Sequence, residues 1–517
     1  QKIRKQVHIR IIGDYDVDGV TSSHLFLTAL RRVGAKVDVV IPHRIQDGYG
    51  LSLHLLQQAK EDGVDTILTC DNGIAAIDEI AWAKAQKMTV LVTDHHAVPF
   101  EEHEGRRTEK KSLADAVVNP HQQDCGYPYK ELCGAGVAWN VIRVLYENYD
   151  MDKREAEDLL DFVAMATVCD VMSLTGENRI LVKEGLKRIR HTKNIGLQAL
   201  MQACNVQPEN ISAYHFGYVL GPCVNATGRL DTARHALRLF ETGQETEAEE
   251  IARDLVDLNQ ERKELTLQGV EMAKKLCEEG GYENDPILVL FLPDVHESIA
   301  GLIAGRIREM YNRPVFVLTR GEEGVKGSGR STENYSMYEN MCGCAELFTK
   351  FGGHPMAAGL SLPEENVEKF RRKINENCPL TVEEVCPDIH IDMAMPVGYA
   401  STELVHQFAL LEPFGKDNPS PLFADRNLSI SRMWVIGKNR NVLRMSVLSE
   451  YGQPVPVIFF GDVETLFAYF TEKFGQEEVE NALHGRKNRI LFSMVYTAKV
   501  DFYQGNENLQ LEMKYYR

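Results

Sequence analysis

The sequence lacks any apolar run that approaches the length of a membrane span. The clean apolar run from Ile287 to Leu292 is far shorter than the roughly 20 residues that a transmembrane helix needs, so we expect a buried strand there. The first residues, Gln1 to Lys5, carry no apolar signal region. This pattern predicts a cytoplasmic protein, although a chain that starts with Gln rather than Met leaves open whether residues precede it.

Patterned cysteines are also absent. The chain has 11 cysteines, none of them in a CxxC pair, and only Cys342 and Cys344 lie close in sequence. A structural zinc site or a disulfide framework would need regular spacing. The scatter therefore indicates reduced thiols in the cytosol, most of them small core residues.

Positive charge is in short supply. With 57 Lys and Arg against 75 Asp and Glu, the net charge is −18, which excludes a protein that coats nucleic acid indiscriminately. The excess is uneven, because the residues from Pro421 onward hold 12 basic and 11 acidic side chains. A nearly neutral C-terminal module thus follows an acidic body, and a local basic path for DNA is still allowed.

The length of 517 residues, 44% of them hydrophobic, predicts a globular chain of roughly three domains. Strand and helix patterns alternate over the first 120 residues, which favours a parallel α/β sheet with ligands at the carboxyl ends of its strands. The expected strands are 7–13, 36–41, 66–70 and 89–93, and the expected helices are 20–33, 51–62 and 75–86.

The predicted secondary structure changes along the rest of the chain. A mostly helical stretch over 134–239 is followed by a long helix over 247–279. A second α/β unit then begins, with strands at 287–292 and 314–319, helices at 298–311, 336–348 and 364–376, and a Gly-rich turn at 324–329. After Pro413 and Pro419, short strands separated by turns predict a small β-barrel.

Acidic and imidazole side chains follow three of the expected parallel strands. Asp14, Asp16 and Asp18 follow the first, Asp71 follows a second, and Asp-His-His at 94–96 follows a third. Strand ends of this kind meet at one edge of a sheet, where carboxylates repel one another unless cations bind between them. A mixed carboxylate and imidazole set suits Mn²⁺ or Mg²⁺, although the first segment could instead be a helix-capping turn.

Asp170 is a further acid, and it interrupts an otherwise apolar segment. A buried carboxylate is costly unless it is paired or bound to a metal ion. The alternative is an N-cap for a helix that starts near residue 178.

These motifs resemble the DHH phosphoesterases, which are named for the triplet found here at 94–96. Members of that family share a binuclear metal centre, usually with Mn²⁺. The resemblance implies these metal ligands, with Asp71 as the bridge: Asp14, Asp16, Asp18, Asp71, His95 and Asp170. Several relatives have His two residues before the position of Asp14, where this chain has Ile12, so one ion is expected to be held more weakly.

Later motifs narrow the resemblance to the RecJ exonucleases. Residues 327–331 and 351–360 resemble the phosphate-gripping and substrate motifs of a DHHA1 domain, and 221–230 and 42–50 resemble RecJ segments. Residues 411–419 resemble the linker into an OB-fold. Cys223 stands where RecJ often has Arg, so no role is carried over to it. By resemblance, the catalytic side chains are His96, Arg229 and His354, and the substrate-binding residues are Arg44, Asn225, Ser328, Arg330, Gly352 and Gly353.

The implied architecture is a DHH parallel-sheet domain joined by a long helix to a smaller α/β DHHA1 domain, then a C-terminal OB-fold β-barrel. We expect the boundaries 1–245, 246–282, 283–395 and 396–517. The implied activity is 5′ to 3′ degradation of single-stranded DNA to 5′-mononucleotides with two divalent cations, Mn²⁺ or else Mg²⁺, in repair and recombination. The implied enzyme is a monomer compatible with helicase and single-strand-binding partners. The alternatives are a phosphodiesterase for short oligonucleotides or cyclic dinucleotides, and an inactive scaffold.

Overall fold

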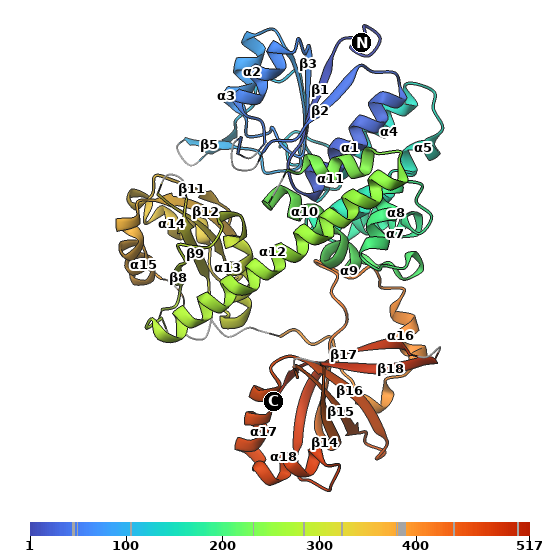
Figure 1. The fold of residues 1–517 in the computed structure, drawn as a ribbon, viewed down its shortest axis with the longest axis vertical. Helices are drawn as coiled ribbons and strands as arrows, with labels where there is room; N and C mark the ends of the chain where they lie inside the picture. Colours follow the sequence, from blue (N-terminus) through green and yellow to red (C-terminus); the bar gives the residue numbers. More distant parts are fainter. Residues whose placement is uncertain are drawn as a thin grey trace. The chain divides into compact units, whose positions relative to one another are not determined.

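The computed structural model describes residues 1–43, 47–48, 50–103, 106–230, 232–282, 285–321, 324–378, 380, 389–437, 440–503 and 506–517. The chain divides into two compact units, Gln1–Pro387 and Asp388–Arg517 (Figure 1). Among the described helices, none combines the length and the apolar character that crossing a bilayer requires.

The first unit begins with a parallel sheet, as the strand and helix alternation predicts. Alternating side chains point to opposite faces, so Ile11 packs in the core with Leu25 and Val137, whereas Ile12 packs with Leu56 and Ile80. In spatial order the strands are β2 (Val37–Val40), β1 (Ile9–Ile12), β3 (Thr66–Cys70), β4 (Thr89–Thr93) and β7 (Ala116–Val118).

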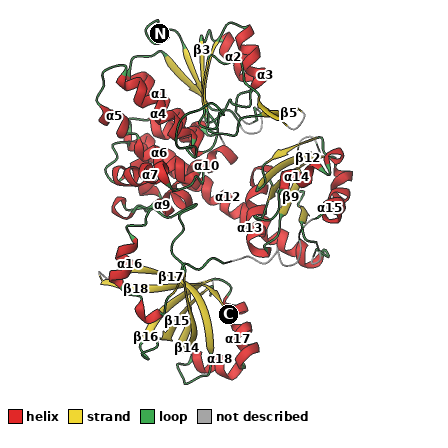
Figure 2. Ribbon diagram, turned by 180° about the vertical axis from the view of Figure 1, so that it is seen from behind, coloured by secondary structure: helices red, strands yellow, loops and turns green. Residues whose placement is uncertain are grey.

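Helices cover both faces of this sheet. Figures 1 and 2 show α1 (Val17–Arg32) and α4 (Gly134–Glu147) on one side, with α2 (Leu53–Glu61) and α3 (Ile77–Ala85) on the other. A small antiparallel hairpin of β5 (Phe100–His103) and β6 (Arg106–Glu109) precedes β7. Because β1, β3 and β4 are neighbours, the residues that follow them share one edge of the sheet.

The expected helical stretch is present and packs on the same core as β1 and α1. It consists of α5 (Lys153–Glu157), α6 (Leu160–Cys169), α7 (Gly176–Ile189), α8 (Ile195–Ala203), α9 (Ala213–His215), a π-helical turn (Phe216–Leu220), α10 (Gly221–Leu230) and α11 (Arg234–Glu241). The long helix α12 (Glu245–Glu279) follows and is visible along its length in Figure 1.

The second sheet of this unit corrects one prediction. We expected a Gly-rich turn at 324–329, but Val325–Arg330 is strand β10, which pairs with strands on both sides. Its glycines leave room for packing across the sheet, because a Cβ at Gly327 would lie 2.3 Å from Leu318 Cδ2. In spatial order the strands are β11 (Lys350–Gly353), β12 (Ala357–Leu362), β10, β9 (Val315–Arg320) and β8 (Leu288–Phe291).

Helices of the second sheet lie near their expected positions. They are α13 (Ala300–Tyr311), α14 (Met337–Cys342) and α15 (Val367–Glu376), with 3-10 turns that include Glu297–Ile299. Strand β8 runs parallel to β9, and β10 runs antiparallel to both β9 and β12.

The second unit is a closed β-barrel, as predicted, because the pairing of β14 with β17 joins the ends of its sheet. Around it run β14 (Phe423–Ile436), β15 (Val442–Leu448), β16 (Pro454–Phe460), β18 (Asn506–Tyr516) and β17 (Leu491–Tyr503). The short β13 (Met393–Ala394) and the helices α16 (Thr402–Phe408), α17 (Val463–Phe474) and α18 (Gln476–Leu483) complete the unit, and these helices were not expected.

Candidate metal centre and substrate groove

The loop after β1 presents two carboxylates at the start of α1. Asp16 is the N-cap of α1, and its side chain accepts a hydrogen bond of 3.0 Å from Gly19 N. Asp18 lies in the first turn and accepts hydrogen bonds from Gly134 N at 2.6 Å and Ala135 N at 2.7 Å. These amides belong to the N-terminus of α4, which stabilises a negative charge. Capping and metal binding are therefore compatible here.

The residues after β3 and β4 complete the edge. Asp71 adopts a left-handed backbone with φ of 61°, a conformation that Asp and Asn tolerate better than other side chains. Asp94 accepts hydrogen bonds from the backbone amides of Ile74 at 2.9 Å and His95 at 2.7 Å. Its Oδ1 also lies 2.8 Å from Nδ1 of His96, so Asp94 orients the rest of the triplet.

Acidic and imidazole side chains converge in overlapping groups. Nε2 of His95 lies 3.1 Å from Asp71 Oδ1 and 3.6 Å from both Asp18 Oδ2 and Asp170 Oδ2. Within each group, the possible ligand atoms lie within 4.8 Å of one another. The groups are Asp71, His95 and His96; then Asp18, His95 and Asp170; then Asp14, Asp16 and Asp71.

The electrostatics of this edge are those of crowded carboxylates. Burial, followed by repulsion from Asp18 and Asp16, raises the pKa of Asp71 well above its ordinary value. Burial and repulsion from Asp18 also raise the pKa of Asp16. Burial lowers the pKa of His95, which keeps its ring neutral and able to donate a lone pair. Crowding among the carboxylates thus favours protonation of Asp71, whereas burial disfavours protonation of His95.

The pair of His96 and Asp94 behaves differently. Burial acts to lower the pKa of His96, but the hydrogen bond with Asp94 and the negative charges of Asp94, Asp170 and Asp18 together outweigh it and raise the pKa to about 9. Burial acts to raise the pKa of Asp94, and the bonds from His96 and the backbone amides bring it below its ordinary value. His96 is thus a cation at the edge of the carboxylate group.

The acidic and imidazole side chains at this edge of the sheet are suited to bind a divalent cation. Nε2 of His95 is buried and makes no hydrogen bond with any described residue, although carboxylate oxygens surround it. Gly134 leaves the space open, because a Cβ there would lie 2.7 Å from Asp71 Cβ and 3.0 Å from Asp18 Oδ2. Carboxylate oxygens with imidazole nitrogen form the donor set that Mn²⁺ accepts and Mg²⁺ tolerates.

The structure excludes the alternative that Asp170 is a helix N-cap. Asp170 is not the N-cap of the following helix, because Thr175 holds that position before α7. Asp170 is instead the C-terminal cap residue of α6, where its carboxylate is brought to His95. Val171 next to it has φ of 55°, a strained backbone for a β-branched residue.

A groove lies beside the metal-binding edge. It has a volume of about 540 Å³ and brings together Arg229, Ser328, Arg330 and Gly352, which the sequence predicts as catalytic or substrate residues. Tyr15, from the loop between Asp14 and Asp16, also lines it. Arg330 donates to Gly329 O at 2.7 Å and to Ser328 Oγ at 3.3 Å, so the two predicted phosphate ligands are in contact. Lys326 and Lys350 line the groove as well, and sequence reasoning missed both.

Other predicted residues lie elsewhere. Asn225 Oδ1 accepts a hydrogen bond of 3.2 Å from Val17 N, so Asn225 supports the loop of carboxylates. His354 is exposed in the turn between β11 and β12, where its amide donates to Ala357 O, and Gly353 adjoins it. Arg44 lies outside the described residues. Their roles toward substrate stay predictions.

Most of the site residues that were not predicted from the sequence hold other site residues in place. Asn119 donates to the carbonyl of His96 at 2.8 Å, and the amides of Gly134 and Ala135 hold Asp18. Asp94 is the first residue of the triplet at 94–96, and no separate role for it was predicted. The sequence signal that could have predicted the role of the Gly134 and Ala135 amides is the Gly-rich start of a helix at 134–136.

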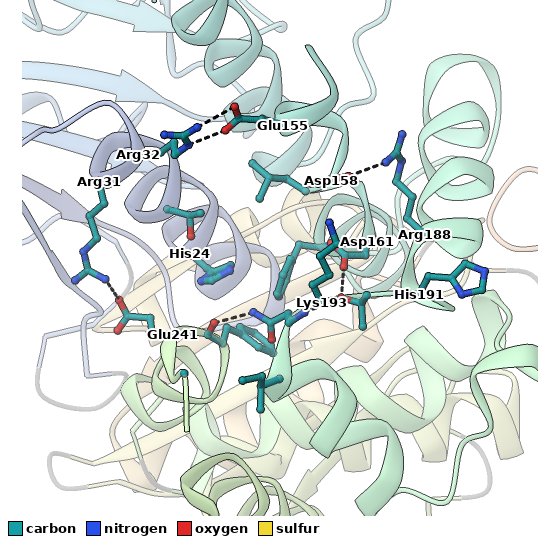
Figure 3. A pocket seen from close by; sticks show the side chains of 18 of the residues that line it. His24, Arg31, Arg32, Glu155, Asp158, Asp161, Arg188, His191, Lys193 and Glu241 are labelled. Carbon is teal, nitrogen blue, oxygen red and sulfur yellow. Dashed lines mark hydrogen bonds and ion pairs between the residues drawn. The ribbon is translucent and has the colours of Figure 1, made fainter. Parts of the chain in front are cut away.

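A larger cavity, of about 1090 Å³, lies at the opposite ends of α1 and α6 from the carboxylates. Figure 3 shows Arg31 paired with Glu241, Arg32 with Glu155, and Arg188 with Asp158 around it, with His24 among them. Burial, with a smaller effect of Arg31, lowers the pKa of His24 to about 4. Burial raises the pKa of Asp161 to about 6. The arginines around this cavity are therefore paired with acids.

Models of three protein families match successive parts of the chain. The DHH family N-terminal domain matches residues 8–167, the DHHA1 domain matches 284–378, and the RecJ OB domain matches 391–515. The first two cover the metal-binding edge and the sheet that lines the groove. Together with the site, they define a metal-binding DHH-family protein.

Individual relatives narrow the family. The single-stranded-DNA-specific exonuclease RecJ of Haemophilus influenzae is 33% identical over 99% of this chain and 88% of its own length. That of Escherichia coli is 32% identical over 98% and 87%. The chain therefore belongs to the RecJ family. It spans only 56% of the Bacillus subtilis RecJ, with 34% identity over 88% of this chain.

A solved structure shows the same arrangement. The crystal structure of RecJ from Thermus thermophilus with Mn²⁺ has a TM-score of 0.79 and 26% identity, and it covers 100% of this chain and 70% of that one. A second structure of that protein contains Mg²⁺, with a TM-score of 0.74 and 25% identity over 100% of this chain and 68% of that one. Both cations suit the ligand set described above.

Replacing Gly134 tests the open space at the metal edge. In Gly134→Ala, the new Cβ would press on Asp71 and Asp18, so we expect weaker Mn²⁺ binding with the fold retained. Isothermal titration with Mn²⁺ measures this, and Gly126→Ala is the matched control because its Cβ meets nothing within 4 Å. Equal Mn²⁺ affinity in both variants would contradict the assignment.

Asp71→Asn tests the shared carboxylate without straining the left-handed backbone, which Ala would do. Because the folded pKa of Asp71 is raised, its ionisation destabilises the metal-free protein above the unfolded pKa. We expect the variant to lose Mn²⁺ binding yet match or exceed the native melting temperature in chelator. The exposed Asp78→Asn is the control. Native-like Mn²⁺ stoichiometry in Asp71→Asn would disprove the bridging role.

His24→Gln tests the second cavity through pH. A folded pKa of about 4 against 6.5 unfolded means that native stability is lost as pH falls through this window, by about 3 kcal/mol for His24. Asp161 acts in the opposite sense, since its raised pKa favours the folded state as pH falls. Removing His24 removes its loss of stability, so the variant should gain stability relative to native as pH falls from neutral. Urea unfolding measures this, with His54→Gln at an exposed position as the control.

Proposed function

We propose that this chain is a metal-dependent exonuclease that degrades single-stranded DNA from its 5′ end to 5′-mononucleotides. The observation that carries the proposal is the meeting of a carboxylate and imidazole cluster with a groove lined by Arg229, Ser328 and Arg330. Membership of the RecJ family supports it, because relatives bear the name single-stranded-DNA-specific exonuclease.

Two divalent cations, preferably Mn²⁺, would be held by Asp14, Asp16, Asp18, Asp71, His95 and Asp170. Such ions activate a water nucleophile and stabilise negative charge on the phosphoryl group when bound. Support for more than one ion comes from the overlap of the ligand groups, since Asp71 and His95 each belong to two of them.

The chain's own cations act on the phosphate. His96, held protonated by Asp94, neutralises a phosphoryl oxygen and can give a proton to the departing 3′ oxygen. Arg229 reaches the groove from α10, and its Nη1 donates to Ser298 O at 2.7 Å. It therefore lies between the metal edge and the phosphate-gripping strand.

The groove sets the 5′ to 3′ direction in which the strand is degraded. A strand with a terminal 5′ phosphate would place that group on Ser328 and Arg330, next to Lys326 and Lys350. The scissile phosphate would then lie at the carboxylates. Gly301 supports this arrangement, because a Cβ there would lie 2.8 Å from Ser328 Oγ and 2.9 Å from Arg330 Nη2.

The barrel offers a separate surface for single strands. Trp434 and Phe460 are exposed on β14 and β16, whereas the neighbouring Phe459 packs in the barrel core. Arg432 lies 5.7 Å from the centre of the Trp434 ring, and exposed Arg444 pairs with Trp434 across the sheet. Aromatic rings with neighbouring cations bind bases without sequence preference.

End-labelled single and double strands with Mn²⁺ or Mg²⁺ test this function. We expect a labelled 5′-mononucleotide as the first product from the single strand, with the duplex resistant. Preference for a dinucleotide over a long strand would favour the short-oligonucleotide phosphodiesterase instead. Longer first products would contradict the proposed cleavage position.

Arg330→Ala should weaken the preference for phosphorylated 5′ ends more than the chemistry. A charged hydrogen bond contributes roughly 1.5–3 kcal/mol, so the ratio of kcat/KM on phosphate and hydroxyl ends should fall about 10- to 100-fold. Arg320→Ala is the control, because Arg320 lies on β9 of the same sheet, pairs with Glu364 and is not among the residues that line the groove. An unchanged ratio in Arg330→Ala would place the 5′ phosphate elsewhere.

A further inference from the structure

Two cysteines, one at the end of α8 and one in α10, lie close together. Cys204 follows α8 as its C-terminal cap residue, and Cys223 lies in α10. Their sulfur atoms are 3.7 Å apart, and both thiols are free. A disulfide needs a sulfur separation of about 2.05 Å, so the atoms must approach by roughly 1.7 Å.

The environment gives the two thiols different reactivity. Cys204 is half-buried, so a small oxidant can reach it, whereas Cys223 is 2% exposed. Cys223 donates to Val219 O at 3.2 Å, and Asn259 Nδ2 donates to its sulfur at 3.4 Å. The hydrogen bond with Cys223, opposed by burial and aided by Lys263, lowers the pKa of Cys204. The same contact and burial raise the pKa of Cys223.

We propose that Cys204 and Cys223 form a peroxide-reactive pair, which a hydroperoxide converts into an intrachain disulfide that slows the nuclease. The Cys204 thiolate attacks a peroxide oxygen and becomes a sulfenic acid, as the O–O bond breaks and the other oxygen leaves as water or alcohol. The Cys223 sulfur then attacks the sulfenic sulfur, and the hydroxyl group leaves as water with the Cys223 proton. Both sulfurs are oxidised and one peroxide is reduced.

The consequence for activity follows from what α10 carries, and this part rests on the proposed function. Asn225, two residues after Cys223, bonds Val17 N in the loop of carboxylates. Gly228 approaches that loop so closely that a Cβ would lie 2.4 Å from Tyr15 O, and Arg229 lines the groove. A shift of α10 toward Cys204 therefore displaces the carboxylate loop, and misplacement of this size slows enzymes by roughly 100-fold.

Hydrogen peroxide treatment of the full-length, Mn²⁺-loaded protein tests the pair. After catalase removes the peroxide, free thiols are alkylated and peptides are analysed by mass spectrometry, while nuclease rates are measured in parallel. We expect a peptide that links residues 204 and 223, a rate reduced roughly 10- to 100-fold, and recovery of both with dithiothreitol.

Variants separate this pair from general oxidation. Cys204→Ser should keep the untreated rate, form no linked peptide and resist peroxide, whereas Cys342→Ser, at an exposed cysteine, should respond like the native chain. Absence of the linked peptide, a linked peptide with no loss of rate, or equal loss in Cys204→Ser would each overturn the proposal. Failure of the proposed function would appear differently, as no nuclease activity before peroxide is added.

Discussion

Repulsion among carboxylates at one sheet edge is the constraint on which the rest of the first unit depends. Asp18, Asp71 and Asp170 lie around His95, Asp14 and Asp16 lie near Asp71, and burial with mutual repulsion raises the pKa of Asp71. Folding must supply compensation, and one part comes from the amides at the start of α4, which bond Asp18. A divalent cation would supply further compensation when bound, because the donor set suits it and Gly134 keeps the space open.

The cluster of carboxylates at this sheet edge could be predicted from the sequence, because the alignment of parallel strands does not depend on how their side chains pack. Once 7–13, 66–70 and 89–93 are recognised as strands of one parallel sheet, their carboxyl ends must lie together. Register confirms it, since Cys70 lies opposite Thr93 and both precede acidic residues. The β-barrel was equally accessible from its pattern of strands, although α17 and α18 were not expected.

Features that depend on distant packing could not be predicted. Residues 324–329 have the composition of a turn, yet they form β10 because Gly327 and Gly329 allow close approach of Leu318 and Phe316. Asp170 has the sequence context of an N-cap, but the end of α6 turns it toward His95. Lys326 and Lys350 carry no local signal, and only their strands bring them to the groove.

Helix α10 makes the metal edge and the groove one site. Asn225 attaches it to the loop after β1, and Arg229 attaches it to Ser298 beside the second sheet. The separation between the carboxylates and Arg330 is therefore not free to vary while both contacts hold. A nuclease that grips a terminal phosphate at one end of that span and cuts at the other would release a product of fixed length. In the proposed function, a constant product size would then follow from these two contacts of α10, with no need for recognition of bases.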